Sequence, residues 1–499
     1  MPDVHRPRRT RIVACAVAAL LLAACGARLT PAQSREGRAA AAHLGATVGP
    51  VDTSSAPVTA AVGDAPRPSR HAADPTLGAA PGAPDMTAPT PQEASIGSGP
   101  APRVTSPVAA SRTACGHSGP LGASDTGVTA SQITITNASD ISGPLPGIFR
   151  SAQDGVKAFV AYFANTGQTV CGRTLHLQSV DTGTSENGDY DAAVAACTSS
   201  FALVGSESGF DEGGAQPVRD CGIPDLRASI SSDARLSDPS VFASNSGSYH
   251  YVTTTLPDYF LGQLGPEAAR SSAFLYLDVT AIKQLVDALE WVFTQRGFTF
   301  VDTQAVDVED FNYTPFVERM KRQGVRFVQF AGALQQAVQL ARAMHDDGFT
   351  PAAFLVAPTV YVPEYAEAGG PAVDNTYTYL SAPLFSEAAP GSEMALYLTW
   401  LARVDPGAAP TFFGIHAWSA ARLFTEIAAA AGPDLTRAKV LARLAAVHRW
   451  TSHGMHAPQD VGGKRTSPCF VIAKLEDSTW SRAAPSEVGH YLCGDVIAH

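Results

Sequence analysis

Short apolar segments alternate with longer amphipathic segments from about residue 128 onward. Apolar residues recur every three or four positions in segments 152–163, 282–293 and 334–344, which predicts amphipathic helices. The alternation predicts an α/β fold with parallel sheets covered by helices on both faces. Residues 391–450 are expected to be mainly helical and to be followed by a β segment at 469–475. The expected strands are Ile133–Thr136, Leu175–Val180, Phe201–Val204, Phe274–Leu277, Phe327–Phe330 and Ala353–Val356.

The N-terminus has the pattern of an export signal. A cationic stretch at residues 5–11 precedes an apolar stretch at 12–22, which is too short to span a bilayer. The following Leu22-Ala23-Ala24-Cys25-Gly26 resembles a bacterial lipobox, in which a peptidase cuts before a lipid-modified cysteine. Residues 1–24 are therefore interpreted as a lipoprotein signal peptide and Cys25 as the lipidation site. An ordinary signal peptide with an incidental cysteine is the alternative.

Residues 25–113 have the composition of a tether. From Gly26 to Thr113 there is no Phe, Tyr or Trp, and Ala, Pro, Gly, Ser and Thr dominate. Such a stretch buries too little apolar surface to offset the entropy lost on ordering, so we expect it to be disordered. The lipid would anchor the chain to the outer face of the cytoplasmic membrane, and this tether would hold the folded part away from that surface.

Charge and cysteine content narrow the function classes further. The net charge of −11 and the lack of a dense Lys/Arg run argue against nucleic-acid binding. No Cys/His cluster has metal-ligand spacing, so no metal or cofactor is expected. In an exported chain, the even number of remaining cysteines favours disulfides. Cys197–Cys221 and Cys469–Cys493 are the favoured pairs, leaving Cys115–Cys171, although six cysteines allow other connectivities.

Several short motifs follow one another in a characteristic order. They comprise the opening strand at 128–135, the turn Asp140-Ile141-Ser142-Gly143-Pro144, Cys171-Gly172-Arg173, Val180-Asp181-Thr182, Phe201-Ala202-Leu203-Val204-Gly205-Ser206, Gly222-Ile223-Pro224, and the segments 324–328 and 341–348. No single motif is diagnostic, but the order and spacing of the set over about 128–494 are. The set resembles the leucine/isoleucine/valine-binding branch of the type 1 periplasmic binding proteins.

The resemblance implies two doubly wound lobes joined by three crossings, with a solute held in the cleft between them. Lobe 1 would comprise 115–245 plus 378–450, and lobe 2 would comprise 246–377 plus 451–499. The implied function is capture of a small polar or amphipathic solute for an ABC importer by a monomer that meets permease and ATPase subunits. A ligand-sensing receptor with the same fold is an alternative that the sequence leaves open.

The resemblance also implies ligand contacts at the carboxyl ends of the strands. For each serine, helix capping or turn closure is the competing interpretation, and for each aromatic it is core packing. The candidate contacts are Ser142, Ser206, Ser208, Phe210, Ser229, Ser231, Tyr249, Asp278, Thr359 and Tyr361.

Thr359 departs from the family pattern. Amino-acid-binding members place a carboxylate at the matching position to pair with the ligand's ammonium group. A hydroxyl cannot replace that ion pair in a closed cleft. We therefore expect a neutral or anionic solute without an α-ammonium group, unless a shifted alignment lets Glu364 or Glu367 supply the charge.

A serine hydrolase is the competing enzyme hypothesis. Gly205-Ser206-Glu207-Ser208-Gly209 is a GxSxG motif directly after an apolar strand, with Ser208 as candidate nucleophile. Against it, no HGGG-type segment precedes the motif, two acids follow it at 211 and 212, and no downstream Asp–His pair has a recognisable context. The sequence therefore favours binding without catalysis. The candidate histidines are His416, expected to be packed in a helix, and His448, His453 and His456, for which a metal site is not favoured.

Overall fold

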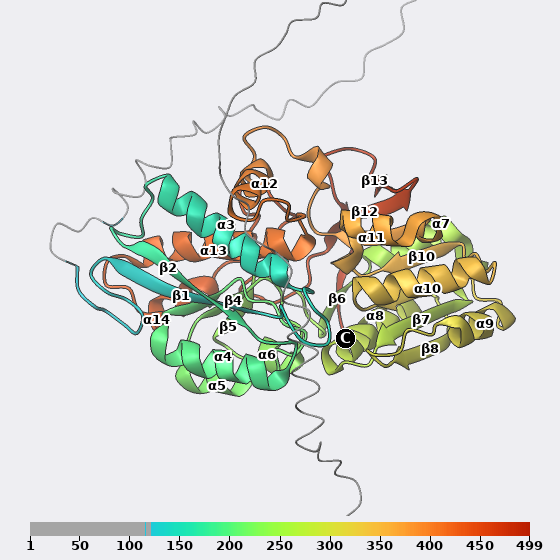
Figure 1. The fold of residues 1–499 in the computed structure, drawn as a ribbon, viewed down its shortest axis with the longest axis horizontal. Coiled ribbons are helices and arrows are strands. Elements are labelled where there is room, and N and C mark those ends of the chain that lie inside the picture. The colour runs from blue at the N-terminus through green and yellow to red at the C-terminus, as the bar shows by residue number, and fades with distance from the viewer. Residues whose placement is uncertain (1–114, 116–120) are drawn as a thin grey trace, which may run out of the picture. The chain divides into compact units, whose positions relative to one another are not determined.

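The computed structural model describes Cys115 and residues 121–499, which form two lobes, each built on its own sheet (Figure 1). The expected signal peptide, Cys25 and the whole expected tether lie outside the described residues. No helix within the described part is both long and apolar enough to cross a membrane.

Lobe 1 contains a five-stranded parallel sheet in the order β2-β1-β3-β4-β5. Helices α3 and α13 pack on one face of this sheet, and α4 and α5 cover the other. The strands are β1 (Gln132–Ser139), β2 (Thr174–Asp181), β3 (Ala202–Val204), β4 (Asp225–Arg227) and β5 (Val241–Ala243). The helices are α3 (Arg150–Asn165), α4 (Glu186–Ser199), α5 (Ala215–Cys221), α6 (Asp233–Leu236), α12 (Glu393–Val404), α13 (Phe412–Ala431) and α14 (Arg437–Leu444).

Helices α3 and α13 approach each other closely at two glycines. A Cβ at Gly155 would lie 2.4 Å from the Gly414 carbonyl oxygen, so no larger residue fits at this helix separation. Trp418 of α13 is fully buried beside this contact, and its indole N–H donates to Glu393 at 2.6 Å. The long C-terminal helix is thereby fixed on the sheet formed by the N-terminal part of the chain.

Lobe 2 contains a mixed sheet in the order β13-β12-β11-β10-β9-β7-β8, with β14 paired to β12. Its parallel strands are β7 (Ser272–Leu277), β8 (Phe300–Val306), β9 (Phe327–Ala331), β10 (Ala353–Val356) and β11 (Thr376–Leu380). The antiparallel edge consists of β12 (Cys469–Glu476), β13 (Thr479–Ala484) and β14 (Leu492–Cys493), and a separate ribbon pairs β6 (Tyr251–Thr253) with β15 (Val496–Ala498). The helices are α7 (Thr255–Ala269), α8 (Thr280–Gln295), α9 (Thr314–Arg322), α10 (Leu334–Asp346) and α11 (Pro363–Gly369), with 3-10 turns η1 (Pro358–Val360), η2 (Gly370–Val373) and η3 (Phe385–Glu387).

The antiparallel edge is an addition to the expected parallel sheet, which the structure confirms. The two residues between β12 and β13, Asp477 and Ser478, have φ values of 48° and 61°. Two positive φ angles in a two-residue loop give the tight hairpin turn that suits antiparallel strands. The chain therefore reverses at once instead of crossing over through a helix.

Three chain crossings join the lobes, and hydrogen bonds link the crossings to one another. Ser246 of the first crossing donates its N–H and its hydroxyl to Gln459 of the third, both at 3.0 Å. Ser381, in the second crossing, contacts Asn245 of the first at 3.3 Å. Because β11 belongs to the lobe 2 sheet up to Leu380, the second crossing begins after that residue, slightly beyond the expected boundary at 377.

The three expected disulfides are confirmed. Cys115–Cys171, Cys197–Cys221 and Cys469–Cys493 have Cα–Cα separations of 5.4, 6.0 and 4.1 Å. The second joins the last turn of α4 to the last residue of α5.

Candidate functional site

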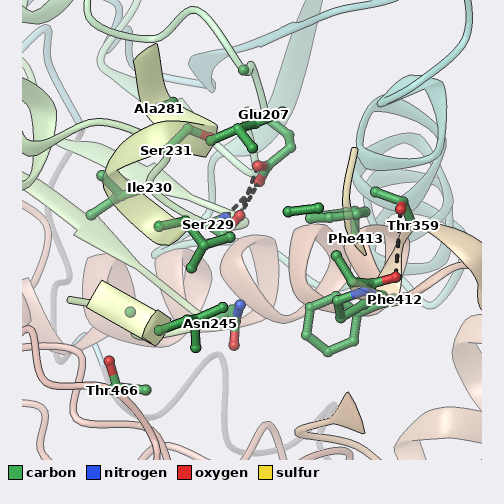
Figure 2. A pocket seen from close by; sticks show the side chains of 18 of the residues that line it. Glu207, Ser229, Ile230, Ser231, Asn245, Ala281, Thr359, Phe412, Phe413 and Thr466 are labelled. Carbon is green, nitrogen blue, oxygen red and sulfur yellow. Dashed lines mark hydrogen bonds between the residues drawn. The ribbon is translucent and has the colours of Figure 1, made fainter. Parts of the chain in front are cut away.

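A cavity of about 270 Å³ lies in the cleft between the lobes (Figure 2). Its lobe 1 wall comes from the loops after β1, β3 and β4, and its lobe 2 wall from the loops after β7, β9 and β10 together with α7 and α8. The crossings and the start of α13 close it at the side. Ligand sites of open α/β sheets form at the carboxyl ends of strands, where all six of these loops begin.

Glu207 forms the polar end of the cavity. Its side chain is 1% exposed, and its carboxyl oxygens accept hydrogen bonds from the N–H and the hydroxyl of Ser229, each at 2.7 Å (Figure 2). Burial raises the pKa of Glu207 to about 8, against the opposing effects of Arg227 and of the Ser229 hydrogen bonds. At neutral pH the group therefore carries a proton and can donate it in a hydrogen bond.

A glycine positions Glu207. The chain leaves β3 through Gly205 at φ +64°, and a Cβ there would lie 2.4 Å from a Val156 methyl and 3.0 Å from the Ala417 carbonyl oxygen. Only glycine fits both the backbone angle and the space. The turn brings Glu207 to the cavity wall, with Ser206 and Ser208 behind it, absent from the wall.

A buried ionic cluster supports the two lobe 1 loops from behind. The Arg227 guanidinium lies 3.4 Å from Asp225 and 3.6 Å from Asp211, and all three side chains are fully buried. Burial opposes the charge of Arg227, but the neighbouring carboxylates, Asp225 foremost, raise its pKa above the usual value. Asp211 in turn accepts the Ser231 N–H at 2.9 Å. Removing one member of such a cluster leaves an unpaired buried charge, so the cluster holds the loops in one arrangement.

Ser208 is engaged with Asp140. Its hydroxyl donates to Asp140 at 3.1 Å and accepts the Phe210 N–H at 3.0 Å, while Asp140 also accepts the Gly209 N–H at 2.9 Å. Burial raises the pKa of Asp140, although Thr182 and the loop donors counteract this. Ser208 is 0% exposed and does not line the cavity.

The histidines considered for a hydrolase lie at other places. His416 is fully buried in α13, as expected, and contacts Ser381 at 3.0 Å, while His456 contacts Ser419 at 2.7 Å. Burial lowers the pKa of His416 well below its usual value and that of His456 to about 4, so both are neutral. His448 and His453 pair with Asp460 and Glu426. No group of three or more potential metal ligands occurs among residues 121–499 and Cys115.

The residues proposed from sequence divide into two groups. Phe210, Ser229, Ser231, Tyr249 and Thr359 line the cavity. The other five do not line the cavity. Ser142 and Asp278 are exposed, and Ser206 accepts the Ala138 N–H at 3.1 Å. Ser208 donates to Asp140, and Tyr361 packs on Phe385 and Trp480. Among the expected alternatives to Thr359, Glu364 lines a second cavity of about 380 Å³ that continues the cleft, and Glu367 is exposed.

Glu207 and the apolar wall of lobe 2 were missed in the sequence. The GxSxG interpretation concentrated on the serines and not on the carboxylate between them, although an acid three residues after the buried strand β3 is itself a signal. The cavity-lining acids are Asp140 and Glu207, both in lobe 1, and Thr359 faces the cavity from lobe 2 with its hydroxyl donating to the Gly332 carbonyl at 2.8 Å.

Comparison with known proteins identifies the architecture. A family model described as periplasmic binding protein matches residues 132–479. No curated protein sequence matches this chain.

Solved structures share the fold at low sequence identity. A fatty acid ABC transporter substrate-binding protein from Thermomonospora curvata has a TM-score of 0.63 at 14% identity, covering 73% of this chain and 97% of that one. A solute-binding protein from R. palustris in complex with benzoate gives 0.60 at 14%, covering 74% and 98%. A leucine-binding protein from Thermotoga maritima gives 0.58 at 14%, covering 70% and 98%.

Proposed function

The chain belongs to the type 1 periplasmic binding proteins, and from this premise we propose that it captures a small solute outside the cytoplasm for an ABC importer. The observation that carries the proposal is the interlobe cavity with polar groups left for a ligand. The Ser231 hydroxyl and the Asn245 side-chain amide N–H line it and make no hydrogen bond within the described part of the chain. A bound solute would satisfy these donors.

Binding without turnover is the second part of the proposal. Acyl transfer needs a nucleophile that a base can deprotonate and that a substrate can reach. Ser208 does not meet the second condition, because it is fully buried and does not line the cavity. The cavity instead offers hydrogen-bonding groups on rigid loops, which suits reversible capture.

The solute is proposed to be neutral or anionic and to lack an α-ammonium group. The lobe 2 wall presents Thr359 where a carboxylate would pair with an ammonium group, and Glu207 is protonated at neutral pH. Among the structural neighbours, the fatty acid and benzoate binders fit this expectation better than the leucine binder. A carboxylic acid, an amide or an aromatic acid is the class we propose.

Attachment and partners complete the proposal. Cys25 would carry the lipid that anchors the protein to the outer face of the cytoplasmic membrane, with residues 26–113 as the tether. A monomer would deliver its solute to permease and ATPase subunits. A sensor with the same fold is the second candidate. If this protein serves an importer, cells lacking it should lose uptake of the identified solute. If it is a sensor, uptake should persist in those cells.

A thermal-shift screen tests the binding proposal. The mature chain should be stabilised by at least one neutral or anionic solute, because binding to the native state raises Tm by mass action. Asn245→Leu should abolish the shift, whereas Asn312→Leu, at an exposed loop position, should retain it. Stabilisation by leucine, isoleucine or valine, with none from their deaminated analogues, would refute the proposed solute class.

A further inference from the structure

Many of the residues that line the cavity belong to lobe 2. Helix α8 contributes one broad apolar face: Val286, Val292 and Phe293 pack into the lobe's own core, whereas Leu285 and Leu289 line the cavity and are half-buried. The opposite wall is also apolar. It comprises Val252, Leu256, Ala331, Ala357, Tyr379 and Phe470.

This part of the cavity suits hydrocarbon better than water. A water molecule occupies ~30 Å³ in the liquid and is held in protein cavities by two to four polar partners. The walls formed by Leu256, Leu285 and Leu289 offer none. Apolar cavities of only about 150 Å³ take up apolar guests such as benzene, and the whole cavity here measures about 270 Å³.

The polar end lacks a cation. No Lys, Arg or His lines the cavity, and its ionisable side chains are Asp140, Glu207, Tyr249 and Tyr379. A ligand head must therefore be held by hydrogen bonds. Ser231 and Asn245 are donors, and the protonated carboxyl of Glu207 is a third.

We propose, on the basis of the solute-binding function above, that the ligand is an amphipath with an unbranched alkyl tail and a carboxylic acid or amide head. The head lies between Glu207, Ser231 and Asn245 in lobe 1. The tail passes under α8 along Leu285 and Leu289 into lobe 2. The tail has a definite end, since the narrow continuation past Leu256 toward Gln329 and Phe274 holds only about 10 Å³, roughly one water.

Isothermal titration calorimetry with butanoate, hexanoate, octanoate and decanoate tests the tail subsite on the mature chain freed of bound solute. Affinity should rise roughly fourfold per methylene, the gain for removing a CH₂ from water, until the subsite is full. Leu289→Asn should weaken octanoate and decanoate at least tenfold and leave butanoate unchanged. Leu264→Asn, at a half-buried leucine of α7 outside the cavity, is the matched control and should leave the whole series unchanged.

The results separate this inference from the general function. Equal affinities across the series, or an equal loss for short and long acids in Leu289→Asn, would overturn the tail subsite. If no member of the series binds but benzoate or another short solute raises Tm, the alkyl-tail inference fails and the solute-binding proposal stands. Thermal unfolding of both variants without ligand, within a few degrees of wild type, shows that the lobes remain folded.

Discussion

Glu207→Gln should make the protein progressively more stable than wild type as pH rises from 5 to 8. Glutamine matches the protonated carboxyl in shape: its oxygen can accept the Ser229 N–H, and its amide can donate to the Ser229 hydroxyl. The variant removes the ionisation of residue 207 and keeps the rest of the site, including Arg227, Asp211 and Asp140.

The magnitude follows from proton linkage. Burial raises the pKa of Glu207 from 4.5 to about 8, so the folded state retains a proton that the unfolded state releases. The stabilising contribution of this proton is fully present below pH 4.5 and is lost as pH rises to 8. The loss reaches about 1.4 kcal/mol per pH unit in the middle of this range and sums to about 3–4 kcal/mol between pH 5 and pH 8.

Urea unfolding at pH 5, 6, 7 and 8 measures this difference. The unfolding free energy of Glu207→Gln minus that of wild type should increase steadily across the series, and other titrating groups, such as Asp189, largely cancel in the subtraction. Glu367→Gln, at an exposed position on α11, should show no such trend. A difference that is flat or falls with pH would refute the assignment of a protonated Glu207 in the native site.

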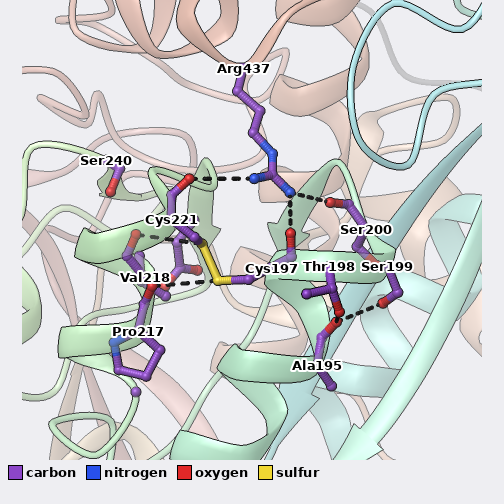
Figure 3. The surroundings of a disulfide bond; sticks show 12 residues. Ala195, Cys197, Thr198, Ser199, Ser200, Pro217, Val218, Cys221, Ser240 and Arg437 are labelled. Atoms are coloured by element: carbon purple, nitrogen blue, oxygen red, sulfur yellow. Dashed lines mark hydrogen bonds between the residues drawn. A yellow bond between two sulfur atoms is a disulfide. The ribbon is translucent and has the colours of Figure 1, made fainter.

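Four further predictions concern packing, covalent links and chemistry. Gly155→Ala should cost about 1–3 kcal/mol of stability in urea unfolding because its Cβ meets the Gly414 carbonyl, whereas Gly262→Ala, with open space around it, should be neutral or stabilising. Replacing Cys197 and Cys221 by serine should cost about 3 kcal/mol, the entropy of closing the loop between them. A loss near zero would mean that the Arg437 bonds to the Cys197 and Cys221 carbonyls hold α4 and α5 without the disulfide (Figure 3). Labelling cells with a fatty-acid analogue should tag wild type and leave Cys25→Ser untagged; equal labelling contradicts the lipid anchor. Purified protein should not hydrolyse acyl esters, and a hydrolysis rate that disappears in Ser208→Ala would establish the hydrolase instead.

Much of the architecture could be predicted from apolar periodicity. The expected strand at Ala353–Val356 coincides with β10, and the helical segment 282–293 lies within α8. The three-residue strands β4 and β5 were not predicted from periodicity, because so short a run has no measurable period. The equally short β3 was found because it lies within the apolar run Phe201–Val204. The antiparallel β12–β13 hairpin was missed because Asp477 and Ser478 do not form one of the sequence pairs that mark such turns.

The site was harder to predict, for physical reasons. Leu285 and Leu289 continue the same helical stripe as the core residues Val286 and Val292, and periodicity cannot separate a side chain that packs from one that faces a cavity. Ser229 and Ser231 were found through the family resemblance, which places polar residues after β4. The protonation of Glu207 depends on burial by loops that are distant in sequence, so the chain alone gives no sign of it.

Equilibrium dialysis followed by chemical analysis of the solute tests the central claim most directly. Using a solute identified by the thermal-shift screen, the account predicts saturable binding of about one solute per chain, weakened by Asn245→Leu, with all of the solute recovered chemically unchanged after prolonged incubation. Recovery of a reaction product, or uptake that does not saturate and is unaffected by Asn245→Leu, would contradict the claim that this cleft captures a solute without transforming it.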